Sequence, residues 1–205
     1  MDGLLFDSEA LFFTAMAAEG ASRGIEVTRS FFLSLVGLNA EHNFVKMREN
    51  YGQGFAAEEF HGACRERFFG LLDTDLKLKP GVQELLEQIE RLGLPKAIAT
   101  SSHRGNVDHH LAAFGLTDRF DVIVANGDYR RGKPHPDPFL AAARALQTET
   151  AQCLALEDSH NGVRSAAAAG MVTVMVPDLL PPTAEMEALA VHIAADLREV
   201  ARILR

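Results

Sequence analysis

The chain has 205 residues, 47% of them apolar, so it can bury one sizeable core and hold a modest inserted subdomain. Its formal net charge is −8 without long blocks of either sign, which argues against a nucleic-acid or anionic-membrane partner. The acidic amino terminus is unlike a signal peptide, and no apolar run reaches the roughly 20 residues of a membrane span. We therefore expect a cytoplasmic globular protein, a monomer or weak dimer, whose partner is a small molecule.

The first part of the chain, residues 10–78, has the spacing of amphipathic helices and no convincing strand. Turns that contain glycine separate the helical patterns. The patterns occur in SEALFFTAMAAEGASRG, SFFLSLVG, NAEHNFVKMRENYG and AAEEFHGACRERFFGLL. The sequence therefore predicts a small helical subdomain.

From Pro80 onward, short apolar runs alternate with helical patterns that close on glycine, which is typical of βαβ units. The first helix, PGVQELLEQIERLG, opens on proline and ends at Gly93, which can adopt a left-handed conformation. Strands are predicted in LPKAIAT, DVIVA, CLALE, VTVMVPD and VHIAA, and helices in VDHHLAAFG, PDPFLAAARAL, VRSAAAAG and the segment that ends in ILR. Because the strands are apolar at nearly every position, both faces should be covered. We expect a doubly wound, Rossmann-like parallel sheet.

The amino-terminal segment MDGLLFDSE places Asp2 before a glycine, a pair that by itself is typical of a turn. Ser8 is a candidate N-cap of the helix that follows, and Asp7 and Glu9 are candidate charges near its amino terminus. Asp2 is also a candidate catalytic carboxylate.

Two further segments carry groups that suit a phosphate. In AIATSSHRGN, Thr100 and Ser101 close a strand before a helix, where hydroxyl and backbone groups can bind an anion or simply cap the helix. In RGKPHPDPF, the prolines around Lys133 fix the backbone and so the direction of its charge. The alternative for Lys133 is a solvated surface residue.

Paired carboxylates follow the apolar run in CLALEDSHNG. Glu157 and Asp158 would repel each other at a buried sheet edge unless a cation lay between them. Hard oxygen ligands beside an anionic substrate suit Mg²⁺. The alternative is a solvated loop in which Asp158 or Ser159 caps the next helix.

The four segments, in this order and spacing, resemble the haloacid dehalogenase-like superfamily over essentially the whole chain. The resemblance implies a magnesium-dependent phosphatase that hydrolyses a small phosphorylated metabolite, a sugar phosphate or nucleoside phosphate, through an aspartyl-phosphate. By this resemblance, Asp2 is the general acid/base. The residues that match the family's phosphate-binding positions are Thr100, Ser101 and Lys133. The Mg²⁺ ligands that the resemblance implies are Glu157, Asp158 and the backbone carbonyl of Asp2. The family's nucleophilic aspartate falls one residue before Met1. Most of a central β-strand is therefore also expected upstream.

The resemblance is strongest to the branch of β-phosphoglucomutase-like proteins and small-metabolite phosphatases. It implies a core of residues 1–9 and 79–205 with a helical cap of residues 10–78. The mutase's cap histidine and arginine are replaced by Phe12 and Ala40, which favours hydrolysis over phosphoryl transfer between two sites. Asn39 and His42 are candidate substrate contacts in the cap, or exposed residues at a helix start.

Three other functions stay open. The chain could be a catalytically inactive relative that binds a phosphorylated ligand or a partner protein, or it could be a phosphomutase. It could also be a dehalogenase, although that chemistry needs no cation, so Glu157 and Asp158 count against it.

Overall fold

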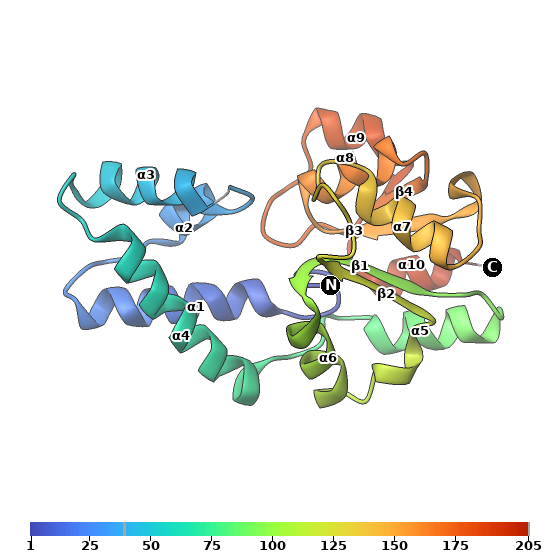
Figure 1. Cartoon of the computed structure of the whole chain (residues 1–205), viewed down its shortest axis with the longest axis horizontal. Helices are drawn as coiled ribbons and strands as arrows, with labels where there is room; N and C mark the ends of the chain where they lie inside the picture. Colours follow the sequence, from blue (N-terminus) through green and yellow to red (C-terminus); the bar gives the residue numbers. More distant parts are fainter. Residues whose placement is uncertain (39, 205) are drawn as a thin grey trace. The chain divides into compact units, whose positions relative to one another are not determined.

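The computed structural model describes residues 1–38 and 40–204 of the chain (Figure 1). Contacts within the chain divide it into two compact units. The α/β unit comprises Met1, Gly3–Leu5 and Lys79–Arg205, and the helical unit comprises Asp2 and Phe6–Leu78. The domain boundaries expected from the family resemblance stay a prediction.

The helical unit contains all four helices predicted from the sequence. They are α1 (Ser8–Ser22), α2 (Arg29–Leu35), α3 (Ala40–Tyr51) and α4 (Ala57–Asp75). Helices α1 and α4 pack against each other and bury Met16 and Phe60. Within residues 1–38 and 40–204, no helix has the length and apolar character that crossing a membrane requires.

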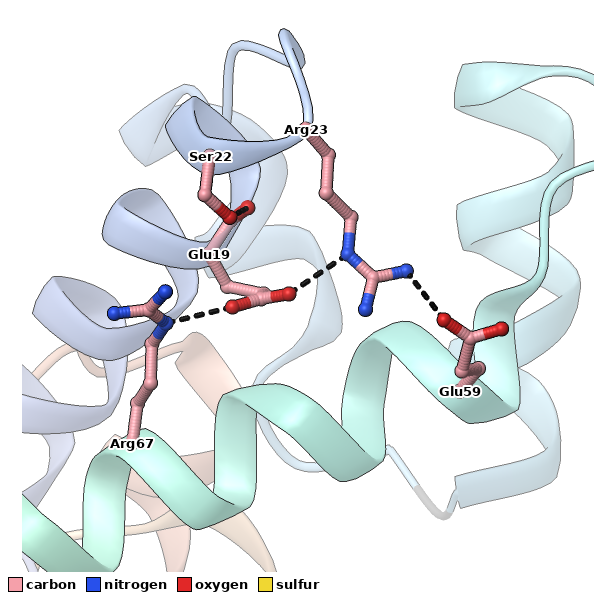
Figure 2. A network of polar contacts seen from close by, with 5 residues as sticks. All are labelled: Glu19, Ser22, Arg23, Glu59 and Arg67. Carbon is pink, nitrogen blue, oxygen red and sulfur yellow. Dashed lines mark hydrogen bonds and ion pairs between the residues drawn. The ribbon is translucent and has the colours of Figure 1, made fainter.

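A carboxylate on α1 holds two arginines inside the helical unit (Figure 2). Glu19 is almost buried, and it accepts hydrogen bonds from Arg67 Nε at 2.6 Å and Arg23 Nε at 2.7 Å. Arg23 also donates to Glu59 on α4 at 3.0 Å. The hydrogen bonds from Arg67 and Arg23 lower the pKa of Glu19. The network therefore ties α1 to α4 through charge as well as apolar packing.

The α/β unit alternates helices and parallel strands, as the sequence predicts. Its strands are β1 (Ala97–His103), β2 (Val122–Asn126), β3 (Leu154–Glu157), β4 (Val172–Met175) and β5 (His192–Ile193). Its α-helices are α5 (Val82–Arg91), α6 (Arg104–Ala113), α7 (Asp137–Ala145), α8 (His160–Ala168), α9 (Ala184–Leu189) and α10 (Leu197–Ile203), with short 3₁₀ turns at Thr117–Arg119 and Thr150–Gln152. Gly93 has φ of 66°, as expected for the residue that ends α5. Helix α9 was not predicted.

The five strands form two parallel sheets instead of the single sheet expected. In the residues that the structure describes, one sheet has the order β1-β2 and the other β3-β4-β5. Ala97 pairs with Val122 in the first sheet, and Leu154 pairs with Val172 in the second. The expectation of parallel strands is therefore confirmed, whereas their union into one sheet is not observed.

A cavity of about 460 Å³ lies between the two sheets. Both β1 and β3 line it, together with apolar side chains from α5, α7 and α10. The cavity is thus lined by strands of both sheets.

Candidate active site

Lys133 and Glu157 form an ion pair at the carboxyl end of β3. Glu157 is the last residue of β3, and Lys133 lies in the loop between β2 and α7. The Lys133 ammonium group donates to Glu157 Oε1, and the two side chains are only 12% and 5% exposed. The same ammonium group lies 5.1 Å from the centroid of the Phe139 ring. The alternative of Lys133 as a solvated surface residue is therefore wrong, and its role in binding phosphate stays a prediction.

Asp158 follows Glu157 and lies in an electrostatically unfavourable place. Burial and the charge of Glu157 raise the pKa of Asp158 to about 7, although Lys133 and the α-amino group of Met1 oppose the shift. A further cation beside the two carboxylates would remove this penalty. Asp158 does not cap α8, because Ser159 is the N-cap and its hydroxyl accepts from Gly162 N at 3.1 Å. The alternative of Asp158 as a helix cap is therefore wrong.

Two glycines give the carboxylates room. A Cβ atom on Gly162 would lie 1.9 Å from Glu157 Oε2, and one on Gly3 would lie 2.4 Å from Asp158 Oδ2. Gly3 also has φ of 72°, where a side chain is strained. Within the α/β unit, Gly3 of the amino-terminal motif therefore lies against Asp158. Sequence reasoning identified neither glycine's role.

A second ion pair, partly buried, lies beside Gly3 and was also missed. Asp178 follows the apolar run of β4, its side chain is 7% exposed, and its Oδ1 accepts from Lys79 at 2.5 Å. Its Oδ2 is buried, has no hydrogen-bond partner in the described part of the chain, and would lie 3.2 Å from a Cβ on Gly3. The signal available in the sequence was an acid directly after an apolar strand, the same signal that identified Glu157.

Thr100 and Ser101 lie inside β1, which continues to His103. Thr100 is 3% exposed, its hydroxyl accepts from Ser102 N at 3.1 Å, and its carbonyl accepts from Tyr129 Oη at 3.1 Å. Ser101 is exposed. The N-cap of α6 is His103, without a side-chain cap hydrogen bond, so neither hydroxyl residue caps that helix. Their role in binding phosphate stays a prediction.

Asp2 and Ser8 bond to each other in the helical unit. Asp2 Oδ1 accepts from the Ser8 hydroxyl at 3.1 Å, and Ser8 is 3% exposed. The N-cap of α1 is Asp7, which makes no side-chain cap hydrogen bond. The expectation that Ser8 is an N-cap is therefore wrong, because its hydroxyl is used to orient Asp2.

The predicted substrate contacts in the helical unit are placed only in part. Asn39 lies outside the described residues, and His42 is exposed in the first turn of α3. Phe12 packs edge-on against Phe68 at 5.4 Å and His61 at 6.1 Å between ring centroids. Phe12 is thus part of an aromatic cluster of the helical unit.

The predicted Mg²⁺ ligands are two side chains and one backbone oxygen. In residues 1–38 and 40–204, no three or more His, Cys, Asp and Glu side chains are grouped to hold a metal ion. The donor chemistry suits Mg²⁺ nevertheless, since Glu157 and Asp158 supply hard oxygen atoms, and burial together with the charge of Glu157 raises the pKa of Asp158. A further carboxylate would complete such a site.

The chain belongs to the haloacid dehalogenase-like hydrolases, a family that matches residues 1–176. It is 34% identical to "Putative phosphatase YhcW" of Bacillus subtilis over 91% of this chain and 84% of the relative. It is 31% identical to hexitol phosphatase B of Escherichia coli over 86% of this chain and 81% of the relative. A structure of CbbY from Rhodobacter sphaeroides with xylulose-(1,5)bisphosphate is 26% identical, has a TM-score of 0.74, and covers 97% of this chain and 92% of that one. The chain therefore lies close to the phosphatase and phosphoglucomutase branch of the family.

Proposed function

We propose that this chain belongs to a magnesium-dependent phosphatase that hydrolyses a small sugar phosphate or nucleoside phosphate. The observation that carries the proposal is the cluster of Lys133, Glu157 and Asp158 at the end of β3. It combines a directed cation for a phosphoryl group with two hard oxygen donors for a metal ion. The resemblance to hexitol phosphatase B supports a sugar phosphate as the substrate.

The proposed roles follow the chemistry of each group. A carboxylate of the residue before Met1 attacks phosphorus, and Asp2 donates its proton to the leaving oxygen. Asp2 then takes a proton from the water that releases inorganic phosphate. The Ser8 hydroxyl, which donates to Asp2, keeps that carboxyl group in one orientation. Bound Mg²⁺ would lower the charge repulsion between the carboxylates and the phosphoryl group.

The remaining proposed roles concern binding. Thr100 and Ser101 supply donors to the phosphoryl oxygens, and Lys133 supplies positive charge. Glu157 and Asp158 hold Mg²⁺ together with the carbonyl of Asp2. His42 and Asn39 are proposed to contact the substrate.

Hydrolysis is favoured over phosphoglucomutase chemistry by the environment of Phe12. A mutase must hold two phosphoryl groups, and Phe12 occupies the position that matches its cap histidine. The Phe12 ring packs against Phe32, His61 and Phe68, and it offers no donor to a second phosphate.

The test compares two chains extended upstream of Met1 by the same apolar segment, one ending in Asp and the other in Asn. Hydrolysis of p-nitrophenyl phosphate is measured with Mg²⁺ and with EDTA. We expect turnover only from the Asp chain with Mg²⁺, and its loss in Asp158→Asn. Asp118→Asn, at an exposed carboxylate, serves as the matched control. Activity that resists EDTA, or that survives Asp158→Asn, would contradict the proposal.

A further inference from the structure

The carboxylate of Asp178 has one oxygen atom that the described part of the chain does not satisfy. Its Oδ1 accepts from the Lys79 ammonium group at 2.5 Å, and the Asp178 side chain is only 7% exposed. Its Oδ2 is buried and has no hydrogen-bond partner among residues 1–38 and 40–204. An unsatisfied buried acceptor on a charged group is costly, so Oδ2 requires a donor from outside the chain.

Asp178 Oδ2 and Asp158 Oδ2 face the same point beside Gly3. A Cβ atom on Gly3 would lie 2.4 Å from Asp158 Oδ2 and 3.2 Å from Asp178 Oδ2. The absence of a side chain on Gly3 therefore lets both oxygens approach this place. Because two carboxylate oxygens repel each other, a group that carries positive charge or hydrogen-bond donors is favoured near them.

The backbone holds Asp178 close to the acidic pair. Glu157 is paired with Met175 in the parallel sheet, and Val176 N then donates to the Glu157 carbonyl at 2.7 Å, beyond the end of β4. Asp178 follows two residues later. Its position is therefore set by the same end of the sheet that presents Glu157 and Asp158.

Lys79 holds the Asp178 carboxylate from another segment. The backbone N–H of Lys79 donates to the Leu5 carbonyl at 2.8 Å, which ties Lys79 to the segment that contains Gly3. The Lys79 side chain is 23% exposed. Because Lys79 and Asp178 together carry no net charge, the pair presents an oxygen acceptor beside Glu157 and Asp158 without adding negative charge there.

An acceptor in this position suits a water molecule bound to a metal ion. No three His, Cys, Asp and Glu side chains are grouped to hold a metal ion in the part of the chain that the structure describes, which argues against Asp178 as a third direct ligand. Mg²⁺ keeps several of its waters in proteins, and these waters are hydrogen-bond donors. Groups that bind such a metal site from outside its direct ligands commonly set its affinity.

We propose that Asp178 is a positioning residue of the Mg²⁺ site. Its Oδ2 accepts a hydrogen bond from a water molecule of a Mg²⁺ ion held by Asp158, and Lys79 fixes the Asp178 carboxylate in the orientation that this requires. The inference rests on the proposed function for the metal ion. The geometry of Lys79, Asp178 and Gly3 supplies the rest.

The test measures Mg²⁺ binding to the 205-residue chain by isothermal titration calorimetry. We expect Asp178→Asn to raise the Kd for Mg²⁺ about ten-fold or more. Asparagine would turn its Oδ1 toward Lys79 and leave an NH₂ donor where the metal-bound water needs an acceptor. Glu84→Gln is the matched control, because it removes an exposed carboxylate that is paired with Arg198 in the same unit, and it should leave the Kd unchanged.

Two further variants separate positioning from structural support. Lys79→Arg keeps the cation and should bind Mg²⁺ like the parent chain. Lys79→Met/Asp178→Leu removes both charges, so it should remain folded in EDTA and still bind Mg²⁺ as weakly as Asp178→Asn. Urea unfolding in EDTA and in Mg²⁺ gives the second measurement. A carboxylate with only a structural role would change stability equally in both buffers, whereas a positioning residue changes the stabilisation that Mg²⁺ adds.

The outcomes separate this inference from the proposed function. Parent-like Mg²⁺ affinity in Asp178→Asn, with binding lost in Asp158→Asn, would overturn the inference and keep the metal site of the proposed function. No saturable Mg²⁺ binding by the parent chain would also overturn the inference. Binding that depends on both Asp158 and Asp178, together with no hydrolysis of p-nitrophenyl phosphate by the extended Asp chain, would refute the function and keep the inference.

Discussion

The Lys133 ammonium group binds the Glu157 carboxylate across 24 residues of sequence, and both side chains are nearly buried. Such a pair is costly to desolvate and costlier to break, because the surviving partner is left as an uncompensated charge. A phosphoryl group or metal ion that binds here as proposed has to compete with this contact.

Removing one member of this pair should destabilise the α/β unit more than removing both. In metal-free buffer, we expect Lys133→Met to lower the free energy of unfolding by about 3 kcal/mol. The double variant Lys133→Met/Glu157→Leu should lose clearly less. Urea unfolding measures both, with Arg131→Met, at an exposed cation of the same loop, as the control. Equal losses in the single and double variants would show that the buried charge is compensated elsewhere.

The raised pKa of Asp158 should make the metal-free protein less stable as pH rises. Between its ordinary value of 3.8 and about 7, the folded state holds a proton that the unfolded state has lost, so stability falls with rising pH. The whole effect is at most about 4 kcal/mol. Unfolding with EDTA between pH 4 and 8 should show a shallower fall in Asp158→Asn than in the parent chain. Asp118→Asn should follow the parent, and Mg²⁺ should reduce the fall.

Replacing Gly162 should separate stability from function. Alanine suits a helix better than glycine by up to about 1 kcal/mol, but its Cβ would collide with Glu157. We expect Gly162→Ala to displace Glu157 and to reduce Mg²⁺-dependent turnover of the extended chain at least about ten-fold. Gly105→Ala in α6, where a Cβ meets nothing within 4 Å, is the control. Unchanged turnover in Gly162→Ala would mean that Glu157 has no fixed position in the reaction.

Glu19 should contribute to the stability of the helical unit at neutral pH. Its pKa is lowered by Arg67 and Arg23, so its contribution is present above the ordinary value of 4.5 and is lost as pH falls through the lowered value. Thermal unfolding at pH 7 should show a lower midpoint for Glu19→Gln, with the difference shrinking in acid. Glu59→Gln, at the exposed end of the same network, should have a smaller effect. A difference that persists in acid would point to packing as its cause.

Local patterns predicted most of the fold. Gly93 ends α5 in the left-handed conformation expected, and β3 ends at Glu157 as its apolar run indicates. Helix α9 was missed because it is only six residues long, follows two prolines and has an apolar face too short to show a period. The split into two sheets could not be predicted from periodicity, which reports which residues are buried and not which strands pair.

Sequence reasoning selected candidate residues that follow a strand end, and it missed the groups that tertiary contacts bring beside them. Glu157 and Asp158 were identified because carboxylates directly after an apolar run are conspicuous. The pairing of Glu157 with Lys133 depends on the α7 crossover, which brings segments 24 residues apart together. The constraint that Glu157 places on Gly162 depends on how the Glu157 side chain folds over the first turn of α8. Asp178 carried the same local signal as Glu157, and its partly buried partner Lys79 lies 99 residues away.

The cavity between β1 and β3 also sets an order of events during synthesis. The two strands that line it begin at Ala97 and Leu154, 57 residues apart in the chain. At about 5–20 residues per second, β3 leaves the ribosome on the order of 3–10 s after β1. During that interval the apolar side chains of β1 that face the cavity lack their later neighbours and are a target for chaperones.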